Sequence, residues 1–195
     1  MGKLDVLLRR DRTIRAMGFD DAPFARHSSA PVPVAGVACA GTRLEGMVWG
    51  HVARDGWDAT SMLAQLLLGS KFLPQLHVVL LDGICLGGLN AVDLPALAGQ
   101  LERPCIAVMR RPPDAAAMER AMQRLPHPRA RWAIVQRAGP VRAHPPFYFQ
   151  ACGTDAATAA RVLERLTDCG RVPEPLRLAH AIGSAVVLGE SRGRA

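Results

Sequence analysis

Several features that define whole classes of protein are absent from this sequence. It has no apolar run of about 18 residues, the length that a membrane-spanning helix needs. Residues 1–15 are polar and arginine-rich and contain no apolar h-region, so we expect no secretory signal. The five cysteines are widely spaced and form no Cys-x-x-Cys pair, which argues against a zinc ribbon and a disulfide scaffold. We therefore expect a cytoplasmic protein that makes no contact with a membrane.

Lysine is almost absent as well. Only Lys3 and Lys71 are present, so arginine carries nearly all of the positive charge, and the net charge is +7. A surplus of positive charge favours a polyanionic partner, which could be nucleic acid. The preference for arginine can also reflect genome composition, in which case the charge describes an ordinary basic surface.

The composition that remains is that of a globular protein. The chain has 195 residues, of which 49% are apolar and 21% charged, which is enough to bury a core. We find no internal repeat, no low-complexity segment and no linker between domains. The sequence therefore predicts a single domain over residues 1–195.

Hydrophobic periodicity predicts an antiparallel start followed by alternating helices and strands. Residues 3–12 are charged and are interpreted as a frayed or strand-like lead-in. The predicted strands are 13–20, 34–40, 44–53, 77–82, 104–109, 132–136 and 147–152, and the predicted helices are 60–68, 93–101, 112–125, 155–169 and 176–189. This order predicts an α/β fold: a ribonuclease-H-like mixed sheet of antiparallel hairpin strands and parallel strands, with helices on both faces.

The chain is organised around the predicted strand that ends at Asp82. Residues 78–81 form a short continuous apolar run, which is typical of a strand buried on both faces. Asp82 and Gly83 follow directly, and open α/β sheets build their sites at the carboxyl ends of central strands. Gly87 and Gly88 leave room for backbone, ligand or ion to approach closely. The alternative is that Asp82 only caps a turn.

Other acidic residues fall at the ends of predicted elements. In the predicted topology the first and fourth strands are adjacent, so Asp20 and Asp82 become neighbours. Asp58 or Asp55, after the hairpin, can reach the same place; Asp55 and Asp21 are the alternate ligands, although Asp21 faces the opposite side of its strand. Three carboxylates this close need a cation, and oxygen ligands suit Mg²⁺ or Mn²⁺, which can activate water for attack on a phosphodiester. The alternative is that each aspartate is an unrelated cap or turn residue.

Basic side chains are expected beside these acids. Arg110 and Arg111 follow the predicted strand next to the central one, where Arg110 can contact a phosphate. Arg177 and His180 are three residues apart on the final helix and share a face, and His180 can transfer a proton or bind phosphate. We predict that Arg110, Arg111 and Arg177 bind nucleic acid. The alternatives are surface arginines and a histidine at the edge of the core.

Five segments together resemble one known family. Residues 18–24, 55–60, 81–93, 173–180 and 189–195 read Gly-Phe-Asp-Asp-Ala-Pro-Phe, Asp-Gly-Trp-Asp-Ala-Thr, Leu-Asp-Gly-Ile-Cys-Leu-Gly-Gly-Leu-Asn-Ala-Val-Asp, Pro-Glu-Pro-Leu-Arg-Leu-Ala-His and Gly-Glu-Ser-Arg-Gly-Arg-Ala. They resemble the family first catalogued as domain of unknown function 99 and since linked to an endonuclease that acts at deoxyuridine. The resemblance spans nearly the whole chain.

That family is in turn similar to endonuclease V, a ribonuclease-H-like nuclease that uses Mg²⁺ to nick DNA or RNA near deaminated bases. The resemblance implies that Asp20 and Asp82 are metal ligands. It implies that Asp58 or Asp55 replaces a glutamate ligand of endonuclease V.

The same resemblance places Arg110 where endonuclease V has a lysine and His180 where its last helix has a histidine. Two segments depart from the pattern. The hairpin turn at residues 41–43 lacks the Pro-Tyr-Ile-Pro wedge with which endonuclease V opens a duplex. Residues 84–90 replace its His-Pro-Arg segment.

These observations lead to one main hypothesis and two alternatives. The main hypothesis is a Mg²⁺-dependent endonuclease of DNA repair that nicks DNA at or near a deaminated base, deoxyuridine by resemblance. Asp20, Asp82 and Asp58 hold the metal in this hypothesis, and Arg110 and His180 complete the catalytic set. The alternatives are a non-catalytic nucleic-acid-binding protein and a metal-dependent phosphohydrolase of small nucleotides.

Overall fold

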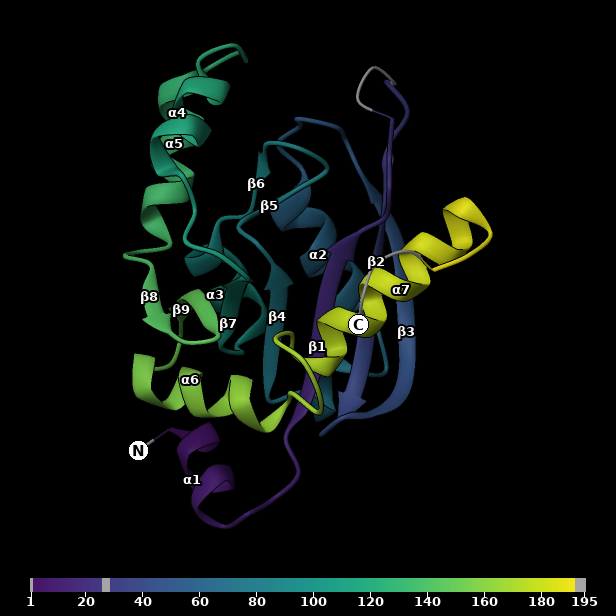
Figure 1. Ribbon diagram of the computed structural model, residues 1–195, viewed down its shortest axis with the longest axis vertical. Helices are drawn as coiled ribbons and strands as arrows, with labels where there is room; N and C mark the ends of the chain where they lie inside the picture. The colour runs from purple at the N-terminus through teal and green to yellow at the C-terminus, as the bar shows by residue number, and fades with distance from the viewer. Residues whose placement is uncertain (1, 26–28, 192–195) are drawn as a thin grey trace.

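The computed structural model is built on a mixed sheet of seven strands in the order β3-β2-β1-β4-β7-β9-β8 (Figure 1). It describes residues 2–25 and 29–191, so the end of the last quoted segment, 192–195, lies outside the described residues. The strands are β1 (Arg15–Asp21), β2 (Val32–Ala40), β3 (Arg43–Val52), β4 (Val78–Asp82), β7 (Cys105–Met109), β8 (Arg142–His144) and β9 (Phe147–Cys152). A small separate sheet pairs β5 (Cys85–Leu86) with β6 (Asn90–Ala91).

Helices cover both faces of the large sheet. They are α1 (Lys3–Arg9), α2 (Ala59–Leu68), α3 (Leu94–Leu101), α4 (Ala115–Met122), α5 (Pro128–Arg137), α6 (Ala156–Arg165) and α7 (Glu174–Leu188), with one turn of 3₁₀ helix, η1 (Leu73–Gln75). In Figure 1, α6 and α7 lie in front of the sheet and α2 and α3 lie behind it. Across the described residues, no helix has the length and apolar composition needed to cross a membrane.

The three central strands β1, β4 and β7 run parallel, whereas the flanking strands pair antiparallel. Along β4, Val78 and Leu80 join the core on the side of α6, and Val79 and Leu81 join the core on the side of α2 and α3. β4 is therefore buried on both faces, as its continuous apolar run predicts. The predicted mixed sheet with helices on both faces is confirmed.

One predicted strand is a helix, and that prediction was wrong. Residues 132–136 lie inside α5, which begins at Pro128. A short apolar run does not distinguish a strand from a buried helix segment. Proline in the first turn favours a helix, and Trp132 and Val135, three residues apart, both pack on the core.

Two smaller differences concern the ends of the sheet. Residues 3–9 form a helix rather than a strand-like lead-in, because Leu4, Leu7 and Leu8 share one face and join the same core cluster as α6. Arg142–His144, inside the predicted loop 137–146, forms the edge strand β8 beside β9.

The cysteines form no disulfide bond with one another. The structure describes all five, and each one is free. Burial raises the pKa of Cys39 and that of Cys85 to about 12, so both thiols stay protonated at neutral pH. Cys169, in contrast, is exposed.

Candidate active site

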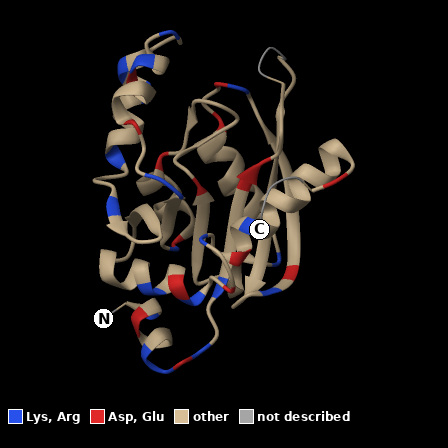
Figure 2. Ribbon diagram, in the orientation of Figure 1, with Lys and Arg blue, Asp and Glu red and all other residues tan. Residues whose placement is uncertain are grey.

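Asp20 and Asp82 lie next to each other at the carboxyl ends of two parallel strands. The register of β1 and β4 sets Gly18 beside Leu80 and Phe19 beside Leu81. One residue further along both strands, this register brings Asp20 beside Asp82. Figure 2 shows acidic segments at these ends of β1 and β4. The topology thus places two carboxylates at one edge of the sheet.

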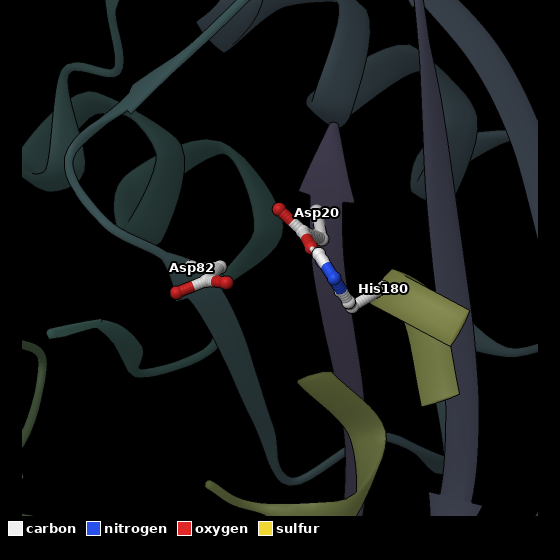
Figure 3. Close-up of side chains that lie close together, drawn as sticks. All are labelled: Asp20, Asp82 and His180. Atoms are coloured by element: carbon white, nitrogen blue, oxygen red, sulfur yellow. Dashed lines mark hydrogen bonds and ion pairs between the residues drawn. The ribbon is translucent and has the colours of Figure 1, made fainter. Parts of the chain in front are cut away.

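Helix α7 adds a third side chain to these carboxylates. His180 Nδ1 lies 2.8 Å from Asp20 Oδ2 and donates a hydrogen bond to it. Potential ligand atoms of Asp20, Asp82 and His180 all lie within 4.8 Å of one another. Figure 3 shows His180 reaching from α7 toward Asp20 on β1, with Asp82 at the end of β4. We call these three residues the acidic cluster.

Gly18 allows α7 to lie close enough to β1 for this contact. A Cβ atom at position 18 would lie 2.6 Å from the carbonyl carbon of Pro175 and 2.8 Å from the backbone nitrogen of Leu176. Both atoms belong to the backbone at the start of α7, so a larger residue would push the helix away from the strand. The glycine two residues before Asp20 therefore sets the distance at which His180 meets the carboxylate.

The burial of these groups shifts their titration. Asp20 is only 5% exposed, and burial raises its pKa to about 6; Asp82 and Asp21 add repulsion, and the hydrogen bond from His180 opposes the rise. Burial also raises the pKa of Asp82, against the attraction of Arg110. The hydrogen bond to Asp20 raises the pKa of His180, and burial opposes this rise. The carboxylates are poorly solvated and would gain from a positive charge.

This donor set fits a divalent cation. Two carboxylates and one imidazole come from three different elements and are close enough to share one ion. Oxygen-rich ligand sets of this kind suit Mg²⁺ and Mn²⁺, with remaining positions left for water or substrate. An ion here would offset the burial of two negative charges, which the partly exposed His180 does only in part. The cluster is therefore a candidate metal centre.

Arg110 lies at the edge of the cluster. Its guanidinium Nη2 is 3.4 Å from Asp82 Oδ2, and its side chain is 50% exposed. It follows β7, whose pairing with β4 sets Val108 beside Asp82. Asp20, Asp82, Arg110 and His180 together line an open hollow of about 570 Å³.

The other two arginines of the predicted nucleic-acid contact are placed differently. Arg177 is held by Glu174, with Nε 2.8 Å from Oε2 and Nη2 2.5 Å from Oε1. This pair occupies the guanidinium, and Glu174 is buried. Arg111 is exposed and lines a separate groove beside Arg110.

The acids considered as a third ligand all support a loop instead. Asp58 accepts hydrogen bonds from Ala53 N at 3.1 Å and from Asn90 Nδ2 at 2.6 Å. Asp55 Oδ1 accepts from Leu89 N at 2.8 Å. Asp21 Oδ2 accepts from Gly87 N at 2.6 Å. The structure thus brings none of the three into the acidic cluster, where His180 is the side chain that lies beside Asp20 and Asp82.

Two residues that sequence reasoning missed complete this support. Asn90 is fully buried and also donates to the carbonyl of Ala53 at 2.9 Å. Arg131 is buried too, donates to the carbonyl of Gly56 at 2.8 Å and lies 4.3 Å above the ring of Trp57. Asn90 lies inside residues 81–93, one of the five segments that carry the family resemblance, and this resemblance could have singled it out. No sequence signal pointed to Arg131, because its contacts with Gly56 and Trp57 form only in the folded chain.

Comparison with known families identifies the chain. The family model described as endonuclease dU matches residues 12–187. The chain belongs to the endonuclease dU family. The resemblance read from the five sequence segments is confirmed, and membership supports a nuclease that acts on nucleic acid.

Relatives of this endonuclease dU family member match over almost their full length. The UPF0215 protein of Methanothermobacter thermautotrophicus is 40% identical over 93% of this chain and 92% of its own. The UPF0215 protein of Deinococcus radiodurans is 38% identical over 94% of both chains. A crystal structure of a protein of unknown function from Archaeoglobus fulgidus is 32% identical, has a TM-score of 0.84 and covers 89% of this chain and 98% of its own.

More distant solved structures establish the fold class. Endonuclease V from Ciona intestinalis, solved in complex with DNA that contains an inosine, has a TM-score of 0.54 at 16% identity over 91% of both chains. Endonuclease V from Bacillus subtilis has a TM-score of 0.57 at 14% identity and covers 94% of this chain and 88% of its own. These likenesses confirm the predicted ribonuclease-H-like fold.

Proposed function

We propose that this chain is a metal-dependent endonuclease of DNA repair that nicks DNA at or near a deaminated base, deoxyuridine in the first instance. The observation that carries the proposal is the acidic cluster of Asp20, Asp82 and His180 with Arg110 at its edge. Membership of the endonuclease dU family supports deoxyuridine as the lesion. The inosine-containing DNA bound by Ciona endonuclease V supports a nucleic-acid substrate.

The proposal gives three roles to the cluster residues and Arg110. Asp20 and Asp82 would hold Mg²⁺ or Mn²⁺, which supplies charge stabilisation at the phosphate and lowers the pKa of water. Arg110 is half-exposed at the rim and neutralises a phosphate oxygen by a charge-assisted hydrogen bond. Asp20 keeps the proton on His180 Nδ1, so Nε2 is the nitrogen that exchanges a proton with the reacting groups.

A base that is read by an enzyme must leave the stack and enter a pocket. One cavity beside the end of β7 has an apolar lining that suits this purpose. It measures about 170 Å³ and is lined mainly by apolar side chains, among them Met109 and Trp132. Met109 immediately precedes Arg110, and Gln136 contributes an amide group that can pair with a base edge. The amide nitrogen of Gln150 donates to the carbonyl of Gly139 at 2.6 Å, so only its oxygen can accept from a base. We propose this cavity as the place of the deaminated base.

Incision of end-labelled oligonucleotides tests the proposal. The substrates carry deoxyuridine, hypoxanthine or no lesion, as single and double strands, with Mg²⁺, Mn²⁺ or a chelator. Asp82→Ala should reduce metal-dependent nicking by more than the roughly 10–100-fold typical of losing an outer-shell partner. Asp58→Asn is the matched control: its carboxylate bonds the loop, and asparagine keeps one acceptor oxygen, so cutting should persist within about tenfold.

The other outcomes point to the alternatives. Nicking that survives both Asp82→Ala and a chelator contradicts the proposed site. Tight binding without incision on any substrate favours a non-catalytic nucleic-acid-binding protein. Hydrolysis of free nucleotides without strand incision favours a phosphohydrolase of small nucleotides.

A further inference from the structure

A second recess adjoins the acidic cluster and differs from it in charge. It is a groove of about 380 Å³ lined by Arg110, Arg111, Pro112, Pro145, Pro146, Tyr148 and Arg171. Its walls come from three segments: the residues after β7, the turn and strand at β8–β9, and the connection between α6 and α7. Three arginines and no acidic residue line it. We call it the arginine groove.

The arginine groove and the hollow of the acidic cluster share one lining residue. Arg110 lines both recesses, and one of its nitrogens lies 3.4 Å from Asp82 Oδ2. Arg110 can therefore contact an anion in the groove or a phosphate held at Asp20 and Asp82. This shared arginine favours a chain of phosphates over a single small anion, because one polyanion can occupy both recesses at once.

Two of the three arginines in the groove are available to a ligand. Arg111 and Arg171 are exposed, and within the described ranges 2–25 and 29–191 neither side chain makes a hydrogen bond or ion pair with another residue. Their situation contrasts with that of Arg177, which is paired with Glu174, and of Arg137, which lies 2.6 Å from Asp93. Asp114, close to Arg111 in the chain, accepts a hydrogen bond from Ala117 N and caps α4.

We propose that the arginine groove binds backbone phosphates of a nucleic-acid strand. These phosphates are adjacent, along the same strand, to the phosphate that the acidic cluster holds. Arg111 and Arg171 contact successive backbone phosphates, and Arg110 lies between the groove and the cutting site. This inference rests on the proposed endonuclease function and extends it, because it gives the strand a path past the carboxyl ends of β4 and β7. Contacts to phosphate position a strand without reading its sequence.

Binding measurements on paired variants test the groove. The probe is a fluorescein-labelled single-stranded oligonucleotide of about 15 nucleotides, and its anisotropy is measured in the Asp82→Ala background, which keeps the strand intact. Arg111→Ala with Arg171→Ala removes two groove charges. Arg10→Ala with Arg12→Ala removes two exposed charges before the amino end of β1, whereas Asp20 lies near its carboxyl end. Both pairs lower the net charge equally.

The groove pair should weaken binding by about tenfold or more and reduce the slope of log affinity against log salt by about 1.4, or about 0.7 per lost phosphate contact. The control pair should change affinity by less than about threefold, as expected for charges outside the contact. Arg111→Lys with Arg171→Lys keeps the charge and should recover most of the loss. Equal weakening by the groove pair and the control pair overturns the proposal.

Incision separates this inference from the proposed function. With Asp82 intact, replacing Arg111 and Arg171 by alanine should raise KM more than it lowers kcat. The lost contacts stabilise the bound substrate and the transition state equally. Metal-dependent incision with unchanged KM and binding in the groove pair overturns the groove and leaves the nuclease. Selective loss of binding in a chain that never cuts supports the groove and overturns the nuclease.

Discussion

Asp20 shows how one buried carboxylate connects stability to metal binding. Burial raises its pKa to about 6 in the folded chain, whereas an unfolded aspartate titrates near its ordinary value of 3.8. Between these values the folded chain keeps a proton that the unfolded chain has released. The contribution of this group to the free energy of unfolding therefore falls as pH rises through that window. A cation at the site offsets this loss at neutral pH.

This competition between proton and cation gives a prediction for metal affinity. Affinity for Mn²⁺ should rise by about tenfold per pH unit up to about pH 6 and level off above it. Calorimetric titration between about pH 5 and about pH 8 measures it. Asp20→Asn, the control, should lose both the affinity and its dependence on pH. Equal affinity at the two ends of the range contradicts the assignment of Asp20 as a ligand.

The residues of the candidate site divide by how they could be predicted. Asp20, Asp82 and Arg110 follow from one rule, that the ends of adjacent parallel strands meet. His180 required the family resemblance, because its contact with Asp20 joins residues 160 positions apart. Asp58 follows the hairpin, a plausible sequence position for a metal ligand. In the structure its carboxylate accepts hydrogen bonds from loop residues instead, and no local sequence pattern encodes that contact.

Among the elements, the contact between β1 and α7 controls the site most directly. Gly18→Ala would place a Cβ against backbone atoms at Pro175 and Leu176. We expect it to lower the free energy of unfolding by about 1–3 kcal/mol, the usual range for overpacking. The same change moves His180 away from Asp20, so incision should fall as well. Chemical denaturation and incision kinetics measure the two effects.

The control for this variant is another glycine in the same chain. A Cβ at Gly99, within α3, would meet nothing within 4 Å. Gly99→Ala should therefore stabilise the protein by about 0.5–1 kcal/mol, the usual gain for alanine in a helix, and leave incision unchanged. Equal effects of the two substitutions would contradict the close contact of α7 with β1.

The loop between β4 and α3 depends on one buried amide. Asn90 donates to Ala53 and Asp58 and accepts from Ala59 N at 3.1 Å. Asn90→Ala leaves these groups without partners and should lower the free energy of unfolding by at least ~2 kcal/mol. Asp58→Ala should add less in the double variant than alone, because the two side chains share one bond.

Metal binding separates this structural role from a catalytic one. Thermal unfolding with and without Mn²⁺ should show the same metal-induced shift in Asn90→Ala as in wild type, because the acidic cluster is unchanged. Loss of that shift would show that the loop takes part in holding the ion.

Most elements could be predicted from periodicity, and the exceptions have a common cause. The predicted strand at 132–136 and most of the lead-in at 3–12 lie in helices, and each of these helices packs only three of its side chains on a core cluster. Such short patterns fit either period, and tertiary packing decides between them. The longer run at 60–68 favoured a helix, and the Asp82-Gly83 turn directly after the short run at 78–81 favoured a strand.

At the scale of the whole molecule, the net charge of +7 predicts a salt dependence of binding, and that dependence distinguishes the hypotheses. A protein that binds a strand releases counterions from several phosphates, so its affinity should fall linearly on a log–log salt plot, by about 0.7 per contact. Fluorescence anisotropy with Asp82→Ala measures this slope. A slope near zero, together with turnover of mononucleotides, would favour the small-nucleotide phosphohydrolase.

The distribution of thiols gives the molecule a native attachment point for a probe. Cys39 and Cys105 are buried, Cys85 and Cys152 are partly covered, and Cys169 is exposed. A maleimide dye at neutral pH should therefore react first at Cys169, in the connection between α6 and α7. Cys169 is two residues from Arg171, and Arg171 lines the arginine groove. The arrival of a strand can then be followed by fluorescence in the unaltered chain, without an engineered cysteine.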